Sequence, residues 1–234
     1  MITADDIETT LRDTRSMMMG IAILMVILYH AVCSNLPMGL LTIPATYGLI
    51  GVDIFLFLSA YGLCYSLQNK NLREFYGRRF MRILPAYVIL VFSILIISVI
   101  CAGGGRGALD IVGVCTTTFF WGVGDVFVDW YLTALLYLYL LFPLFYKLIN
   151  KFGLAILLII STLALCYVWY IPHPWFHESA MCRIPIFLSG IYFYRSRRSI
   201  LSVILLSAIF AALCIFSFFT GKVCLTYYIW LLSY

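Results

Sequence analysis

A histidine inside an apolar stretch is the first residue of this sequence that could do chemistry. Residues 17–36 have the length of a membrane-spanning helix, for which about 20 residues cross a ~30 Å hydrocarbon core, and His30 lies well inside them. An imidazole at that depth loses its hydration, so it is expected to face protein or a water-filled cavity. His30 is therefore either a catalytic base or a helix-packing residue that bonds a neighbouring hydroxyl.

A carboxylate, Asp53, lies in the second apolar run. His30 follows Met17 by thirteen residues and so lies roughly 20 Å from the inner surface. Asp53 follows Ala45 by eight residues on a descending helix and lies roughly 18 Å from that surface. At matching depth the carboxylate could orient the imidazole and raise its basicity, as in acyl-transfer sites. A structural polar tie between two helices explains Asp53 equally well.

Arginines form the third chemical feature. Residues 69–85, NKNLREFYGRRFMRILP, are the most basic part of the chain. Arg78 and Arg82 are four residues apart and Arg79 and Arg82 are three apart, which predicts one helical face. Clustered guanidinium groups suit phosphates. The other interpretation is ordinary cytoplasmic charge that fixes topology.

The composition indicates the kind of fold that positions these residues. The 234 residues are 64% hydrophobic and 11% charged, with a mean hydropathy of +1.05. A soluble domain of this size could not bury so much apolar surface, so an all-α, polytopic transmembrane helical bundle in a lipid bilayer is expected. The net charge of +5 then needs no nucleic acid as a partner. Without internal repeats or linkers, residues 1–234 are expected to form a single domain.

About seven to eight spans are predicted. A polar cytoplasmic lead-in, residues 1–16, precedes them, with Thr10 or Asp13 as the helix cap. A long loop, 103–129, is apolar enough over 111–128 to lie on the membrane or dip into it. The expected spans are 17–36, 45–67, 83–102, 130–146 (ending through Pro143), 152–170, 183–194 and 200–219, with 223–234 as an incomplete last helix.

The distribution of Lys and Arg predicts a cytoplasmic N-terminus. In that orientation the inner loops hold ten basic residues: Lys70, Arg73, Arg78, Arg79, Arg82, Lys147, Lys151, Arg195, Arg197 and Arg198. The outer loops hold only three: Arg106, Arg183 and Lys222.

A pair of histidines lies in the loop before the sixth predicted span. His173 and His177 are four residues apart, but Pro172 and Pro174 argue against a helix there, so no metal site is expected. The loop is interpreted as a lid or an acceptor contact.

Taken together, these motifs resemble the acyltransferase-3 family of integral-membrane O-acyltransferases, which typically move acetyl or related groups onto bacterial glycans. The similarity runs from about Met17 through Gly190. It is carried by GIAILMVILYHA, GVDIFLFLSAYGL, FYGRRFMRILPAY, WYLTALLYLYLLFPL and RIPIFLSG, in that order.

The resemblance implies roles for individual residues. His30, oriented by Asp53, would be the catalytic base. Arg78, Arg79 and Arg82 would bind the phosphates of cytoplasmic acyl-CoA, with acetyl-CoA as the expected donor substrate. No permanently bound cofactor is implied. The acceptor would be a glycan or lipid-linked saccharide, and the location the bacterial plasma (inner) membrane, crossed several times. Trp130 and Arg183 fall in motif positions that imply substrate binding.

The sequence departs from the family pattern at three points. Many members carry an Arg directly before Gly20, where this chain has Met19, so Arg15, one turn earlier, is expected to take over donor binding. Acidic residues of the Trp-to-Pro helix are replaced by Leu135 and Leu136. The family usually has about ten helices, so this chain is expected to be a shortened member. A polysaccharide exporter or flippase component without chemistry and an inactive truncated relative are the alternatives.

Overall fold

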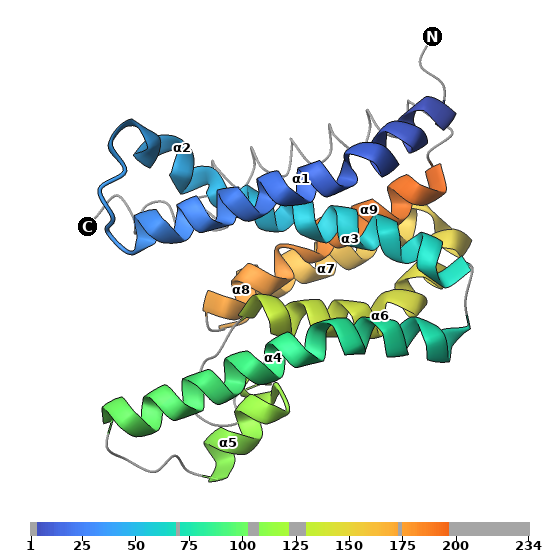
Figure 1. Cartoon of the computed structure of the whole chain (residues 1–234). Helices are drawn as coiled ribbons and strands as arrows, with labels where there is room; N and C mark the ends of the chain where they lie inside the picture. Colours follow the sequence, from blue (N-terminus) through green and yellow to red (C-terminus); the bar gives the residue numbers. More distant parts are fainter. Residues whose placement is uncertain (1–3, 69–70, 103–107, 122–129, 173–174, 197–234) are drawn as a thin grey trace.

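The protein is a bundle of helices. The computed structural model describes residues 4–68, 71–102, 108–121, 130–172 and 175–196 (Figure 1). Within these ranges the regular structure is helical throughout, with no strand, so the all-α prediction is confirmed.

Two long antiparallel helices form one side of the bundle (Figure 1). The first is α1, Ala4–Cys33. Short helical pieces lead from it into α3: η1 (Gly39–Leu41), α2 (Thr42–Thr46), η2 (Tyr47–Leu49) and α3 itself (Ile50–Gln68). Because α1 begins at Ala4, the lead-in is part of this helix, and Thr10 and Asp13 lie inside it rather than at its cap.

Glycines fix the register between α1 and α3. A Cβ atom on Gly51 would collide with the Ala22 carbonyl oxygen, and one on Gly48 would collide with that of Met25. Small residues allow such close backbone approach between helices in membranes. The two contacts together align Ala22 of α1 with Gly51 of α3, and Met25 of α1 with Gly48 of η2, which leads into α3.

The basic segment is helical. α4 runs without interruption from Leu72 to Ala102, so the arginines occupy its first turns, and Pro85 lies within it. The prediction of a loop up to residue 83 was therefore wrong. Pro85 does not interrupt α4, because neighbouring groups can satisfy the freed backbone of a membrane helix. After α4 come α5 (Ala108–Cys115) and η3 (Thr118–Trp121), within the region predicted to lie on the membrane.

The remaining helices complete the bundle. They are α6 (Trp130–Phe152), α7 (Leu154–Tyr170), α8 (Trp175–Met181) and α9 (Ile184–Ser196). The predicted end of this span at residue 146, through Pro143, was too early, because the proline is buried inside the helix, which continues to Phe152. The predicted loop around His177 is in part the helix α8.

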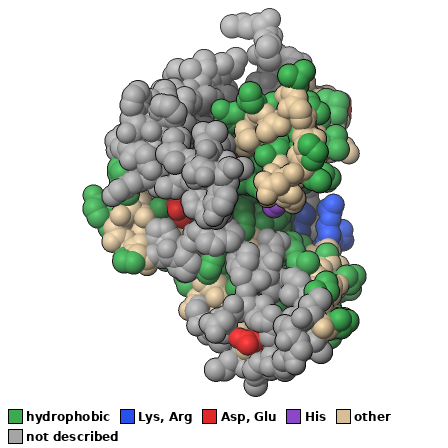
Figure 2. Space-filling view, turned by 90° about the vertical axis from the view of Figure 1, so that its left-hand side faces the viewer, with side chains coloured by type: hydrophobic (Ala, Val, Ile, Leu, Met, Phe, Trp, Pro, Cys, Tyr) green, Lys and Arg blue, Asp and Glu red, His purple; other side chains and the backbone are tan. Residues whose placement is uncertain are grey.

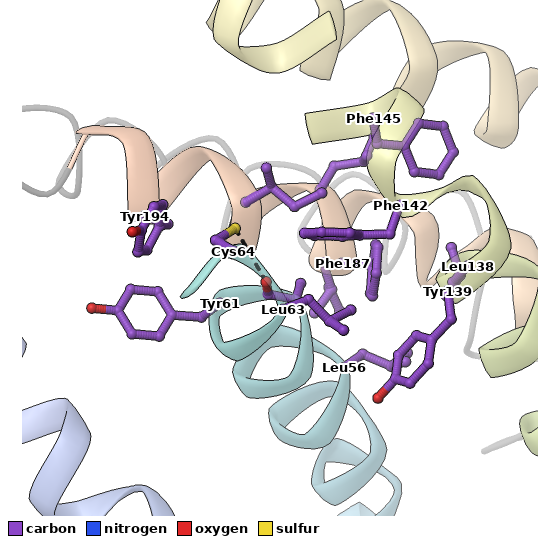
Figure 3. Close-up of a cluster of buried hydrophobic side chains, with 14 of the residues drawn as sticks. Leu56, Tyr61, Leu63, Cys64, Leu138, Tyr139, Phe142, Phe145, Phe187 and Tyr194 are labelled. Atoms are coloured by element: carbon purple, nitrogen blue, oxygen red, sulfur yellow. Dashed lines mark hydrogen bonds between the residues drawn. The ribbon is translucent and has the colours of Figure 1, made fainter. Parts of the chain in front are cut away.

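Aromatic and aliphatic side chains together form the core between α3, α6 and α9 (Figure 3). Phe75 from the start of α4 stacks on Phe142 with ring centroids 5.6 Å apart, and Phe142 meets Phe187 of α9 edge to face at 6.2 Å. On α3 the Cys64 thiol donates to the Ala60 carbonyl at 3.3 Å (Figure 3). The backbones of α3 and α9 also approach closely, since a Cβ on Gly190 would lie 2.5 Å from the Phe57 carbonyl oxygen.

The surface and helix lengths are those of a membrane protein. Large apolar side chains are exposed along α1 and α4, and green hydrophobic atoms cover much of the described face in Figure 2. Among the described residues, four helical segments are long and apolar enough to span a bilayer: Asp13–Cys33, Gly39–Gln68, Leu72–Ile97 and Trp130–Phe152. That is fewer than the seven to eight predicted. α7 and α9 are shorter, and the predictions for 200–219 and 223–234 lie outside the described residues.

Candidate active site

A cavity of about 500 Å³ lies between α1, α3, α4 and α6. Three of the predicted donor-binding arginines line it: Arg15 from α1, and Arg79 and Arg82 from α4. The rest of its wall is mostly apolar or aromatic: Ser16, Met19, Phe55, Ser59, Ile83, Ala86, Tyr131, Leu132, Leu135 and Tyr139. The cavity therefore joins a cationic region to an apolar one.

Helical spacing explains how α4 presents its part of this wall. Arg79, Arg82, Ile83 and Ala86 recur at intervals of three and four residues and so share one face of α4. Arg78, predicted to belong to the same phosphate site, is exposed and does not line the cavity. The structure thus brings together two of the three predicted α4 arginines and adds Arg15 to them.

The charge in the cavity is unbalanced. No Asp or Glu is among the described residues that line it. The Nε atoms of Arg15 and Arg79 are both buried, and neither has a hydrogen-bond partner within the described part of the chain. Buried guanidinium groups normally have anionic or hydrogen-bonding partners, so the cavity is suited to a negatively charged ligand.

Asp53 forms an ion pair with Arg183. The Arg183 Nε atom lies 3.2 Å from Asp53 Oδ1, the arginine is buried, and the Asp53 side chain is 27% exposed. Arg183 also donates from Nη1 to the Ser179 carbonyl at 2.7 Å, and its guanidinium lies 4.8 Å from the centre of the Trp130 ring. The predicted substrate-binding residues Trp130 and Arg183 therefore meet the predicted catalytic residue Asp53.

His30 is not brought to Asp53. The α1–α3 register places Asp53 level with about residue 20 of α1, so His30 lies ten residues, roughly 15 Å, farther along that helix. His30 is exposed and contacts Tyr29 ring to edge at 5.5 Å. The prediction of equal depth assumed that both helices begin at the membrane surface, whereas glycine packing sets their relative height.

A histidine that the sequence assigned to a loop is built into the core. His177 is buried, its Nε2 contacts the Phe120 carbonyl, and its Nδ1 lies 2.9 Å from the Tyr167 hydroxyl. Since a carbonyl only accepts, Nε2 carries the proton and the Tyr167 hydroxyl donates to Nδ1. His177 therefore joins η3, α7 and α8, which is a structural role rather than the expected lid or acceptor contact.

Several cavity residues were not predicted. Ser59 and Tyr139 line the wall, and Gly62 of α3 lies against Arg15. The sequence marks Ser59 and Gly62 only as small residues in an apolar run, LSAYGL, with nothing to show which face they occupy. Their position depends on the packing of α3 against α1 and α6.

A family model described as "Acyltransferase domain", of the acyltransferase-3 type, matches residues 18–234. No curated protein and no solved structure shows significant similarity to this chain.

Proposed function

Since the chain belongs to the acyltransferase-3 family, we propose that it moves an acyl group, with acetyl as the first candidate, from acyl-CoA to a hydroxyl group. The proposed acceptor is a cell-surface glycan or its lipid-linked precursor. The proposed location is the bacterial inner membrane, with the N-terminus and the arginines on the cytoplasmic side. The observation that carries this proposal is the cavity in which three arginines adjoin an apolar wall.

The donor phosphates are assigned to the cationic end. Guanidinium groups bind phosphate oxygens through paired, charge-assisted hydrogen bonds. Arg15, Arg79 and Arg82 come from two helices and converge on one space without a competing carboxylate among the described lining residues. Acyl-CoA enters such a site from the cytoplasm, where it is made.

The pantetheine arm of the donor is about as long as the distance along α3 from Gly62 to Asp53. Gly62, beside Arg15, follows Asp53 by nine residues along α3, which is roughly 13.5 Å. The arm is about as long as four residues of extended chain, or roughly 14 Å. With its phosphates on the arginines, the thioester would lie near the Asp53–Arg183 pair.

The reaction there is a simple acyl transfer. The acceptor oxygen attacks the thioester carbonyl carbon, the carbon–sulfur bond breaks, and CoA leaves as the thiolate. The proton of the acceptor hydroxyl passes to a base and then to the thiolate. His30 is the base implied by the family resemblance, and Asp53 is the alternative that the α1–α3 register favours. His30 can act on this thioester only if α1 and α3 shift or the acyl group moves outward.

A transfer assay tests the proposal. Purified protein in liposomes is given radiolabelled acetyl-CoA and glycan from the producing cells, and label on the glycan is measured. Arg79→Ala should lower kcat/KM by about 10- to 100-fold, since a hydrogen bond to a charged group contributes about 1.5–3 kcal/mol. Arg73→Ala is the matched control, because Arg73 is exposed in the same helix and outside the cavity.

The assay also separates the alternatives. Equal activity of the Arg79→Ala and Arg73→Ala variants would contradict the assignment of the cavity. Translocation of glycan without any acylation would identify a transport protein instead.

A further inference from the structure

Gly62 of α3 differs from Gly48 and Gly51, two earlier glycines that also contact α1. Gly48 and Gly51 are next to the α1 backbone, whereas Gly62 is next to a side chain. A Cβ on Gly62 would lie 2.6 Å from Arg15 Nη2, 2.8 Å from Cζ and 3.0 Å from Nη1. Because these three atoms are almost equally distant, the guanidinium plane lies flat over Gly62.

This contact determines where the charge of Arg15 is held. The side chain of a helical residue points toward the N-terminus of its helix, and that is the direction from residue 15 toward the level of Gly62. The guanidinium thereby reaches the cavity that Arg79 and Arg82 also line. A Cβ at position 62 would occupy this space, and because the guanidinium is the far end of a flexible side chain, the guanidinium rather than the backbone would move away.

We infer that Gly62 is a positioning residue that seats Arg15 as a third phosphate-binding guanidinium, and that the site selects donors with several phosphates. The inference rests on the proposed acyl-CoA function and makes it more specific. It also explains how the chain works with Met19 in the cavity wall: the cation comes from one turn earlier on α1 and needs a glycine opposite it.

Charge matching supports a donor with several phosphates. Three guanidinium groups carry a charge of +3, and no described lining residue opposes it. The diphosphate and the ribose phosphate of CoA together carry roughly four negative charges, since a phosphomonoester carries about −1.5 to −2 at pH 7. A protein-bound phosphopantetheine arm has a single phosphodiester with one negative charge, which would leave like charges uncompensated in a half-buried site.

A double-mutant cycle tests the positioning role. Gly62→Ala should raise the KM for acetyl-CoA about tenfold, as expected for a lost charge-assisted contact, with kcat changed less than twofold. Arg15→Ala should give a similar rise. Adding Gly62→Ala to Arg15→Ala should have no further effect, because the two changes remove the same interaction. Gly20→Ala is the control, since a Cβ there meets nothing within 4 Å.

Truncated donors test the selectivity. Acetyl-dephospho-CoA and acetyl-4′-phosphopantetheine should bind more weakly than acetyl-CoA to the unmodified protein, and Gly62→Ala should affect the phosphopantetheine donor least. Additive effects in the double mutant would overturn the positioning role of Gly62. An equal loss for all three donors in Gly62→Ala would overturn the selection for several phosphates.

The test remains decisive if Gly62→Ala does not accumulate in the membrane. Removal of the guanidinium in the double mutant should then restore accumulation. Failure to restore it would contradict the proposal that Gly62 positions Arg15. The affinity for CoA alone, measured by calorimetry in detergent, reports on the Gly62–Arg15 contact and does not require acyl transfer. Normal CoA binding without transfer would count against the proposed function and leave this inference intact.

Discussion

At the scale of single residues, the ion pair with Arg183 determines the environment of the Asp53 carboxylate. One of its oxygens is 3.2 Å from Arg183, while the side chain keeps 27% of its surface exposed. The sequence could identify Asp53 as a polar residue at membrane depth, because a charge in an apolar run is costly. It could not pair Asp53 with Arg183, which is 130 positions away and reaches Asp53 only when α9 packs on α3.

Substitutions at His30 and Asp53 separate the two candidate bases. Loss of a positioned general base typically lowers the rate about 10²- to 10⁴-fold. From the α1–α3 register we expect Asp53→Asn to lose this much kcat while CoA binding persists, and His30→Ala to lose less. The transfer assay in liposomes gives both values, and near-complete loss in His30→Ala with activity retained in Asp53→Asn would show that this register is not the catalytic one.

Stability must be controlled in that comparison, because Asp53→Asn leaves Arg183 buried without its counter-charge. Breaking one partner of a buried ion pair typically costs about 3–5 kcal/mol. The amount of folded protein in detergent, measured by size-exclusion chromatography, corrects each rate for this loss. Arg183→Lys keeps the positive charge but removes the branched guanidinium group, so it should give more folded protein than Arg183→Ala.

At the scale of elements, residues that break helices in soluble proteins do not break them here. Pro85 and Pro143 both lie inside long helices, α4 and α6. Hydropathy therefore predicts that these helices exist, but prolines, which usually mark helix ends, do not predict where these helices end. The arginine segment before Pro85 was likewise predicted to be a loop, although it is the start of α4. The predicted spacing of Arg79 and Arg82 on one helical face is what places both in the cavity.

His177 tests how the short elements are held. His177→Phe keeps an aromatic ring among Phe120, Trp121 and Phe176 but removes the donor to the Phe120 carbonyl. An unsatisfied buried acceptor costs about 1–3 kcal/mol, so the thermal unfolding midpoint in detergent should fall by several degrees. The KM for acetyl-CoA should not change, since His177 lies outside the cavity. An unchanged midpoint, or a raised KM, would contradict this structural role.

At the scale of the whole molecule, the site is made by four helices, α1, α3, α4 and α6, that together extend from residue 4 to residue 152. Composition was enough to predict an all-α membrane bundle, since no other fold hides this much apolar surface. The shared helical face of Arg79 and Arg82 was predicted from their spacing and Arg15 from the family resemblance, and all three line the cavity, whereas Arg78, predicted with them, does not. The sequence could not predict how far α1 and α3 are shifted along each other, because that register is set by glycine contacts such as Gly51 against Ala22.

The central claim is that the cavity between α1, α3, α4 and α6 holds the phosphates of the donor. Calorimetric titration of the purified protein with CoA tests it most directly, because it requires neither acceptor nor chemistry. We predict saturable binding that weakens at least about tenfold in Arg79→Ala and is unchanged in Arg73→Ala. Equal affinity in all three proteins, or no binding to the unmodified protein, would contradict the claim.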